Sequence, residues 1–503
     1  MMNFALTKTR SAIGIQAKLV SVEVHLTGGL PQFNIVGLPE TAVKESKDRV
    51  RSAILNSYFE FPRRRITVNL APAALPKTGS GLDLAIAIGI LSASNQIPAF
   101  KLSSHEFVGE LALDGNLRGV SGIIPMILAA HLDRQSIIIA TDNAQEAAIT
   151  NLTNVLSASS LRQVCNYICQ DTALTPLPNY QLENHADPID WSEIKGQAHA
   201  KYALEIAACG GHSALMSGPP GSGKTMLARR FHTLLPDLTH EQALESAAIN
   251  SIRGRKTDFA AWKRPPFRAP HHTASMVALV GGGSPPKPGE ISLAHHGILF
   301  LDEVPEFSRN ALESLREPLE SGQVCISRAA LQIDFPAQFQ LIAAMNPCPC
   351  GQWGNAKAAC TCSSERINRY LAKLSAPLLD RIDIHLHVQP LSNEALIAPP
   401  TLNQPDSQAL RERIQQIQAI QITRQGCLNA ALSPKTCEQM ALLDTKTYDF
   451  LNQAMSKLNL SARAFHRLLK VSRTLADYNE QQVVDVSALQ QALSFKQSLR
   501  LPM

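Results

Sequence analysis

The chain has 503 residues, which is too long for a single hydrophobic core, so its length predicts two to four domains. Hydrophobic residues make up 45% and charged residues 18% of the chain, the balance of an ordinary soluble globular protein. A net charge of +5 permits nucleic-acid binding without arguing for it.

Targeting and redox features predict a cytoplasmic protein with no membrane partner. The first 16 residues lack an apolar stretch followed by a small-residue cleavage site. The longest apolar run, 82–93, is too short to span a bilayer. Cysteines in such a compartment are thiols or metal ligands rather than disulfides. Six of the ten are scattered and expected to be ordinary thiols: Cys165, Cys169, Cys209, Cys325, Cys427 and Cys437.

Residues 1–171 predict an α+β domain. Strands are expected over 11–24, 65–70, 107–113, 115–120 and 136–140, with an amphipathic helix over 39–56 and a buried helix over 82–93. Residues 172–190 hold three prolines among polar residues and predict a linker.

Two stretches of this N-terminal domain resemble the protease domain of the Lon family. They are 76–83 (PKTGSGLD) and 115–122 (GNLRGVSG). The family places its nucleophilic serine where this chain has Gly81, and its lysine where it has Ile124 or Met126.

A Ser–Lys dyad requires both side chains within hydrogen-bonding reach. The resemblance therefore implies a Lon-like domain that is inactive as a protease and serves assembly or DNA contact. Ser80 with Lys77 remains the proteolytic alternative.

A phosphate-binding loop is the strongest motif of the chain. Residues 218–225 fit G-x-x-x-x-G-K-[ST], between an apolar strand at 214–216 and a helix that begins at 226–231. Glycines let backbone N–H groups form an anion cradle at the positive end of a helix. The predicted ATP-binding residues are Gly218, Pro219, Pro220, Gly221, Ser222, Gly223, Lys224 and Thr225.

The chemistry of ATP hydrolysis can be assigned to four side chains. Lys224 is expected on the β- and γ-phosphates and Thr225 on Mg²⁺. The apolar strand 297–301 ends in two carboxylates. Asp302 is expected to hold Mg²⁺ through water and Glu303 to polarise the attacking water.

Three further residues fall where AAA+ proteins place residues that respond to ATP. Asn346 follows a buried strand at the sensor-1 position, with a turn or cap residue as the alternative. Arg381 resembles an arginine finger that acts in a neighbouring subunit, with a local pair to Asp380 or Asp383 as the alternative. Arg463 resembles sensor 2, with an exposed helix-start arginine as the alternative.

The segment 264–293 is rich in glycine and proline and predicts an irregular surface loop. Its cationic residues suit DNA phosphates, and a structural hairpin at a subunit interface is an equal alternative. Adjacent histidines do not face the same way, which disfavours a metal. The predicted DNA contacts are Arg264, Arg268, His271, His272 and Lys287.

Two C-x-C pairs follow the sensor-1 strand, in the loop 348–362. Four closely spaced thiols suit a structural Zn²⁺ ion, with free thiols as the alternative. The candidate ligands are Cys348, Cys350, Cys360 and Cys362.

The second half of the chain then divides into three parts. Residues 191–388 predict a P-loop α/β ATPase core, and 389–408, which hold four prolines, a second linker. Residues 409–503 predict a helical lid with helices at 410–423, 433–443, 447–457, 462–477 and 486–495.

Together these strings resemble the ComM family (YifB-type, magnesium-chelatase-like AAA+ ATPases) over essentially the whole chain. The resemblance implies a multidomain α/β protein with a Lon-like domain, an AAA+ core and a helical lid. It also implies a homo-hexameric ring that uses ATP and Mg²⁺ to translocate on single-stranded and branched DNA. Such rings promote branch migration during natural transformation, alongside recombination proteins.

Other functions remain open at this point. A chelatase-type motor would act on a protein or a tetrapyrrole, and a DNA-binding scaffold would use ATP only to assemble. An ATP-dependent protease is disfavoured by Gly81 and the missing lysine.

Overall fold

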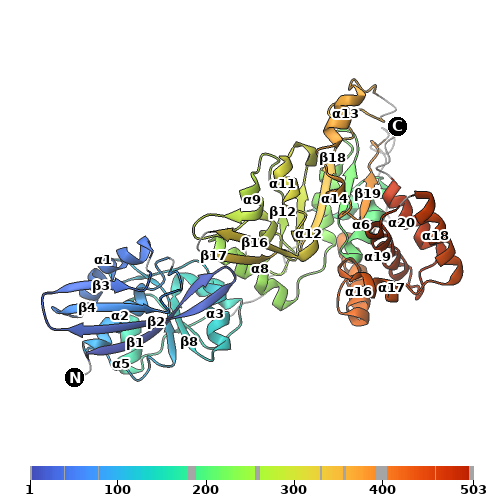
Figure 1. The fold of residues 1–503 in the computed structure, drawn as a ribbon. Helices are drawn as coiled ribbons and strands as arrows, with labels where there is room; N and C mark the ends of the chain where they lie inside the picture. Colours follow the sequence, from blue (N-terminus) through green and yellow to red (C-terminus); the bar gives the residue numbers. More distant parts are fainter. Residues whose placement is uncertain are drawn as a thin grey trace.

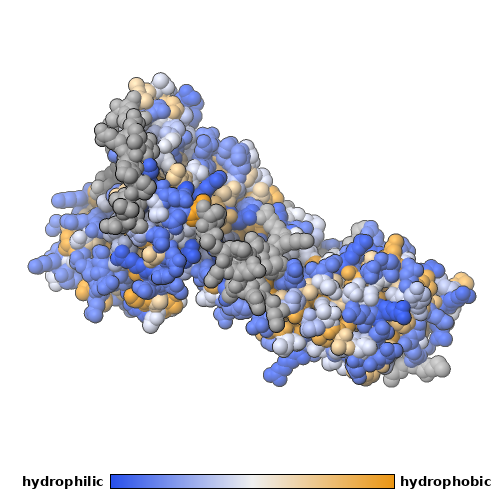
Figure 2. Space-filling view, turned by 180° about the vertical axis from the view of Figure 1, so that it is seen from behind, coloured by the Kyte–Doolittle hydropathy of each residue, from blue (hydrophilic) through white to orange (hydrophobic). Residues whose placement is uncertain are grey.

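The computed structural model describes residues 3–38, 40–77, 79–178, 189–254, 261–328, 331–354, 358–391, 405–458 and 460–497. An N-terminal unit built on a mixed sheet, a core built on a parallel sheet and a helical C-terminal unit follow one another in space (Figure 1). Seen from behind, the visible surface is mostly hydrophilic (Figure 2).

The N-terminal sheet has eight strands in the order β10-β9-β8-β5-β1-β2-β4-β3. Strands β1, β5, β8 and β9 pair in parallel, whereas β2 runs antiparallel to both β1 and β4. The strands are β1 (Phe4–Ile13), β2 (Gln16–Thr27), β3 (Gln32–Val36), β4 (Arg65–Ala71), β5 (His105–Phe107), β8 (Ser136–Ala140), β9 (Val155–Ala158) and β10 (Thr175–Pro176). A separate hairpin joins β6 (Glu110–Leu111) to β7 (Leu117–Arg118).

Helices cover both faces of this sheet. In β8, Ile138 and Ala140 join the cluster with α1 (Thr41–Asn56), α2 (Asp83–Ala93) and α5 (Leu161–Gln170), because strand side chains alternate between faces. Ile137 and Ile139 join the opposite cluster with α3 (Ile123–Leu132) and α4 (Ala144–Ala148). Every residue of α2 is buried, which confirms the predicted buried helix.

The single strand predicted over 11–24 is wrong. Gly14 and Ile15 form a tight turn between β1 and β2, which pair directly across it. Polar and apolar residues alternate in both strands, so the alternation in the sequence continues across the turn. In the sequence a single glycine, Gly14, marks this turn.

The core sheet has five parallel strands in the order β12-β15-β18-β11-β19. They are β11 (Ala214–Ser217), β12 (Phe267–Arg268), β15 (Ile298–Leu301), β18 (Gln340–Met345) and β19 (Ile384–His387). Strands β11, β15 and β18 are buried throughout, as expected for a parallel sheet covered on both faces. The surrounding helices are α6 (Ala198–Gly210), α7 (Lys224–Phe231), α8 (His240–Arg253), α11 (Arg309–Glu313), α12 (Pro318–Ser321), α13 (Ser364–Leu371) and α14 (Ala376–Leu379).

The glycine-rich insert is more regular than its composition predicts. Phe267 and Arg268 form β12, the edge strand of the core sheet. The rest contains α9 (Met276–Val280), the hairpin β13–β14 (Gly281–Gly282 and Lys287–Pro288) and α10 (Glu290–Leu293). A second hairpin, β16–β17 (Gln323–Arg328 and Leu331–Pro336), lies between α12 and β18. The expectation of a wholly irregular loop is therefore wrong, because short glycine-rich strands pair here.

The C-terminal unit consists of helices, as predicted. They are α16 (Ser407–Gln425), α17 (Pro434–Ala441), α18 (Thr445–Leu458), α19 (Ala462–Tyr478) and α20 (Val486–Gln497). One apolar cluster joins them to α6 and β19 of the core. None of the described helices has the length and apolar character that a bilayer span requires.

The N-terminal unit docks on the core through α8. Ile124 and Met126 of α3 belong to an apolar cluster that includes Ala243 and Ala247 of α8. Beside it, the backbone N–H of Gly122 donates to the carbonyl of Ser251 at 3.0 Å. The two lysine positions of the Lon-type dyad are thus occupied by interface residues.

Candidate active site

The phosphate-binding loop lies at the carboxyl edge of the core sheet, between β11 and α7. Gly221 and Gly223 have φ of +76° and +95°, a region that residues with a Cβ rarely occupy. A Cβ on Gly218 would lie 2.2 Å from the carbonyl oxygen of Val388, so only glycine fits there. Gln197, just before α6, steadies the loop by donating to the carbonyl of Ser222 at 3.2 Å.

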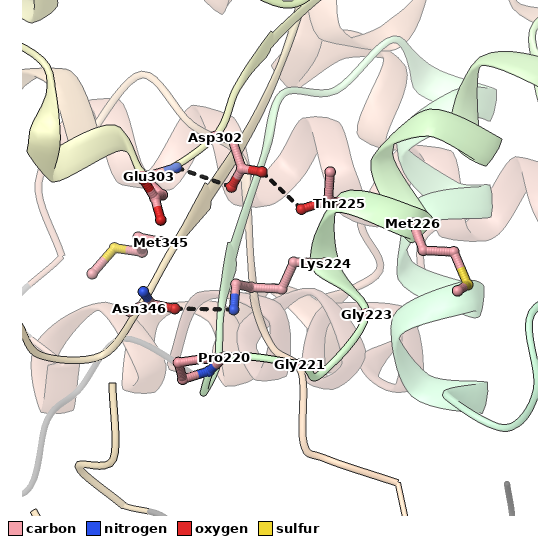
Figure 3. Close-up of a pocket in the computed structure, with 10 residues that line it drawn as sticks. All are labelled: Pro220, Gly221, Gly223, Lys224, Thr225, Met226, Asp302, Glu303, Met345 and Asn346. Atoms are coloured by element: carbon pink, nitrogen blue, oxygen red, sulfur yellow. Dashed lines mark hydrogen bonds between the residues drawn. The ribbon is translucent and has the colours of Figure 1, made fainter. Parts of the chain in front are cut away.

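Lys224, the first residue of α7, points into this loop. Its Nζ donates to the carbonyls of Gly218 at 2.8 Å and Pro219 at 2.9 Å. It also donates to Oδ1 of Asn346 at 3.2 Å (Figure 3). Burial lowers the pKa of Lys224, and the charges of Asp302 and Glu303 oppose that shift. The ammonium is thus held by neutral carbonyl and amide oxygens, which phosphate oxygens can replace.

Thr225 and Asp302 meet across the carboxyl ends of β11 and β15. The hydroxyl of Thr225 donates to Oδ2 of Asp302 at 2.7 Å, and the backbone N–H of Glu303 donates to Oδ1 at 3.0 Å (Figure 3). Hydroxyl and carboxylate oxygens are ligands that Mg²⁺ prefers. The pocket measures about 360 Å³ and is lined by Pro220, Gly221, Gly223, Lys224, Thr225, Met226, Asp302, Glu303, Met345 and Asn346. These residues fit an Mg²⁺–nucleoside triphosphate.

Glu303 is held in an uncommon conformation beside the insert. Its φ of +50° is left-handed, and its side chain is 52% exposed. Nδ1 of His272 lies 3.6 Å from Oε2 of Glu303. His272 follows β12, whose neighbour β15 leads to Glu303, so sheet order explains the contact. Sequence reasoning missed it, since the two residues are far apart along the chain.

The remaining cationic residues of the insert have different surroundings. Arg268 donates to Oε2 of Glu290 at 2.7 Å, so its charge is neutralised locally. His271 is exposed, lies against His272 with the ring centroids 4.1 Å apart and the planes tilted by 34°, and contacts the Thr273 hydroxyl at 2.9 Å. Lys287 is exposed and Arg264 is half-buried. The five predicted DNA contacts therefore differ in exposure and in their local partners.

Arg381 and Arg463 lie outside the nucleotide pocket and meet at one carboxylate. Nη2 of Arg381 donates to Oε2 of Glu320, and its Nη1 donates to the Pro377 carbonyl at 2.7 Å. Nη2 of Arg463 lies 3.7 Å from Oε1 of Glu320. The proximity of Arg381 lowers the pKa of Glu320.

Of the two local alternatives for Arg381, Asp383 has other partners, because it pairs with Arg467 at 2.5 Å and with His212 at 3.0 Å. Arg381 borders a second hollow of about 570 Å³. The hollow is lined by Glu313, Arg316, Glu317, Glu320, Ser321 and Arg381. Sequence reasoning missed Glu320, since no pattern connects α12 to residue 381.

The four cysteines of the predicted zinc loop come together. Cys348 Sγ lies 3.4 Å from Cys350 Sγ and 3.6 Å from Cys360 Sγ, and the latter two are 3.5 Å apart. With Cys362, all four sulfurs lie within 4.8 Å of one another. A zinc ion with four sulfur ligands at 2.3 Å sets the sulfurs about 3.8 Å apart. The four side chains therefore fit a tetrahedral metal ion.

The residues of the Lon-type motif do not form a dyad. The Ser80 hydroxyl donates to Oε2 of Glu110, whereas the buried Lys77 donates to the carbonyl of Pro72. Burial also lowers the pKa of Lys77. Gly81 offers no nucleophile, and a Cβ built there would contact Val120 at 3.5 Å.

A second group of potential metal ligands, Glu245, His295 and His296, is explained by hydrogen bonds. Nδ1 of His295 accepts the backbone N–H of Gln338 at 3.1 Å, so the proton of the neutral ring lies on Nε2. That nitrogen contacts Oε2 of Glu245 at 3.1 Å, and His296 reaches the same oxygen at 2.7 Å. Burial, with the charge of His296, lowers the pKa of His295 to about 4. A neutral ring protonated on Nε2 has no lone pair there for a metal.

Family models identify the class to which this fold and site belong. Residues 190–396 match "Magnesium chelatase, subunit ChlI", 22–143 match "Subunit ChlI of Mg-chelatase", and 404–496 match the C-terminal part of the same subunit. The chain is thus an AAA+ protein of the magnesium chelatase ChlI type, a class that implies ATPase activity.

Full-length relatives narrow this class. The chain is 48% identical to "Competence protein ComM" of Haemophilus influenzae, over 99% of both chains. It is 46% identical to "Uncharacterized protein YifB" of Escherichia coli, over 99% of this chain and 98% of that one. The chain belongs to the ComM/YifB family. A partial similarity, 28% identity over 33% of this chain and 34% of the relative, links it to "Lon protease 2" of Bacillus subtilis.

Proposed function

We propose that the protein is an ATP-driven DNA translocase of the cytoplasm, active as a homo-hexameric ring. In this proposal it promotes branch migration while incoming single-stranded DNA recombines during natural transformation. The name and the full-length similarity of the Haemophilus relative support a role in competence. The contact between His272 and Glu303 is the observation that supports a coupling of DNA binding to ATP hydrolysis. It joins the proposed DNA-contacting insert to the proposed catalytic carboxylate.

The pocket residues divide the hydrolytic work among them. Lys224 binds the β- and γ-phosphates, and Thr225 with Asp302 holds Mg²⁺. Glu303 accepts a proton from the attacking water, which the amide of Asn346 orients against the γ-phosphate. Mg²⁺ supplies charge neutralisation on the phosphates when bound.

The positions of the two arginines support a ring. Arg381 and Arg463 share Glu320 and do not line the pocket that contains Lys224. Among the described residues, none of those that line the nucleotide pocket is an arginine. In a ring, Arg381 would reach the nucleotide of the neighbouring subunit as an arginine finger. Arg463, 60% exposed beside it, would assist as sensor 2.

Two further parts have structural roles in this proposal. The Lon-like domain is inactive as a protease, because Ser80 and Lys77 have other partners, and it serves assembly or DNA contact. The four cysteines hold a structural Zn²⁺ ion, whose four ligands leave no position for catalysis.

The first experiment measures ATP turnover with and without single-stranded and branched DNA over a range of salt concentrations. We expect DNA to stimulate turnover and salt to abolish the stimulation, because phosphate contacts release counterions. Turnover without any DNA response would contradict the DNA motor and favour the chelatase-type motor on a protein or tetrapyrrole. Stimulated turnover would then be followed by a branch-migration assay.

The ring is tested with Arg381→Ala. We expect the variant to bind ATP and assemble normally but to lose turnover by about a thousandfold, the effect of a missing arginine finger. Inactive Lys224→Ala subunits added to Arg381→Ala subunits should restore turnover if arginines act across the interface. Full turnover by Arg381→Ala alone would contradict the assignment.

A further inference from the structure

The cysteine loop, residues 347–354 with 358–362, begins just after strand β18 and Asn346. Met345, the last residue of β18, accepts a hydrogen bond from the backbone N–H of Gly218 at 3.3 Å. Asn346 then contacts Lys224 at 3.2 Å, and Cys348 follows two residues later. The same short stretch therefore touches the phosphate-binding loop and supplies the first metal ligand.

The cysteine loop also contacts the phosphate-binding loop directly. Gly351 has a φ of +77°, and a Cβ built on it would lie 2.5 Å from Cδ of Pro220. Its backbone N–H donates to the carbonyl of Cys348 at 2.9 Å, which closes the turn around the sulfurs. Pro220 itself lines the nucleotide pocket. The backbone at Gly351, between the candidate ligands Cys350 and Cys360, thus lies directly behind Pro220, which forms part of the pocket wall.

We propose that a metal ion bound by the four cysteines holds Gly351 in place against Pro220, so that metal occupancy sets the affinity of the nucleotide site. The proposal rests on the proposed nucleotide site and extends it to a second, structural ion. Four ligands spread over 15 residues close a loop that has no regular secondary structure among its described residues. A metal that binds only the folded loop restricts its motion, and with it the position of Gly351 against Pro220.

The metal is tested with Cys360→Ser/Cys362→Ser in the full-length chain, against Cys169→Ser, which changes an exposed thiol of the N-terminal unit. Metal analysis should find one zinc per subunit in the wild type and in the control, and none in the double variant. Affinity for a fluorescent ATP analogue should fall about tenfold in the double variant only. A wild type that contains no metal would overturn the site, and a metal-free variant with unchanged affinity would overturn the coupling.

The contact is tested with a matched pair of glycines. Gly351 and Gly354 both have left-handed φ, +77° and +75°, but a Cβ on Gly354 has nothing within 4 Å. Gly351→Ala should keep its zinc and bind the analogue several-fold more weakly than Gly354→Ala. Equal affinities of the two variants would contradict the proposal that the contact between Gly351 and Pro220 affects nucleotide binding. No analogue binding by the wild type would instead refute the proposed ATPase function, which separates the two failures.

Discussion

Two glycine–serine–glycine loops occur in this chain, and the one at residues 221–223 borders the nucleotide pocket. Residues 79–81 lead into α2, and residues 221–223 lead into α7. Both loops place a lysine close by, Lys77 in one and Lys224 in the other. Their difference lies in what already occupies the positive end of the following helix.

In the N-terminal loop, carboxylates of the chain occupy that place. Asp83 lies in the first turn of α2, where Ser46 and Arg49 bind it and the N–H of Leu111 donates to it at 3.3 Å. Glu110 accepts the hydroxyl of Ser80. A helix N-terminus that already has an anion has little to offer a phosphate.

In the nucleotide loop, no acidic residue lies in the first turn of α7. Lys224 instead faces carbonyl and amide oxygens at the edge of the pocket. The same short motif therefore becomes a ligand site or a structural turn according to the charges that its neighbours supply.

The largest expected effect comes from Lys224→Ala. Loss of the buried ammonium should weaken ATP binding by at least a hundredfold, about 3 kcal/mol. Titration with a fluorescent ATP analogue measures it, with Lys77→Ala as the corresponding change in the other loop. Normal ATP binding by Lys224→Ala would remove the distinction between the loops.

The second effect concerns stability. Asp83→Ala should lower the free energy of unfolding by about 3 kcal/mol, because it removes a fully buried carboxylate that pairs with the partly buried Arg49. Urea unfolding measures this loss, and Asp48→Ala, an exposed change in α1, should alter stability by less than about 0.5 kcal/mol. Equal stabilities would show that the carboxylate does not hold the N-terminal loop together.

A third, smaller effect compares matched glycines. Gly79 and Gly223 have φ of +77° and +95°, and a Cβ on either meets nothing within 4 Å. Alanine at each should cost about 1–2 kcal/mol of backbone strain. Only Gly223→Ala should also weaken nucleotide binding, by about tenfold, since its N–H belongs to the anion cradle. Binding lost equally in Gly79→Ala would contradict the comparison.

The smallest effect is expected from Ser80→Ala. ATP turnover should stay within about twofold, because the hydroxyl contacts only a carboxylate of its own domain. A casein-cleavage assay on the wild type and the variant checks the proposed absence of protease activity. Cleavage by the wild type that disappears in Ser80→Ala would restore the proteolytic function.

Local sequence patterns predicted much of this structure. The strand before residue 218, the helix after 224, the acidic strand end at Asp302 and the buried α2 all follow from short periodicities. The helices of the C-terminal unit were also predicted, each to within three residues at both ends. Such elements depend on neighbours a few residues apart, which a sequence displays directly.

Long-range contacts could not be predicted. Glu320 and Arg381 lie 61 residues apart, and nothing in α12 indicates its partner. The contact between Gly351 and Pro220 depends on how β11 and β18 pair. Likewise β12 is only two residues long, too short for its alternation to be visible. In each case tertiary packing decides which side chains meet.

The docking of α3 on α8 has a consequence for charged side chains at this interface. Ile124 and Met126, the positions that the Lon resemblance aligns with the family's lysine, are packed in the cluster that joins the N-terminal unit to the core. A lysine at either position would bury an ammonium among alanine and isoleucine side chains, at a cost of several kcal/mol. A Lon-type lysine and the docking of these two units are therefore incompatible in this packing.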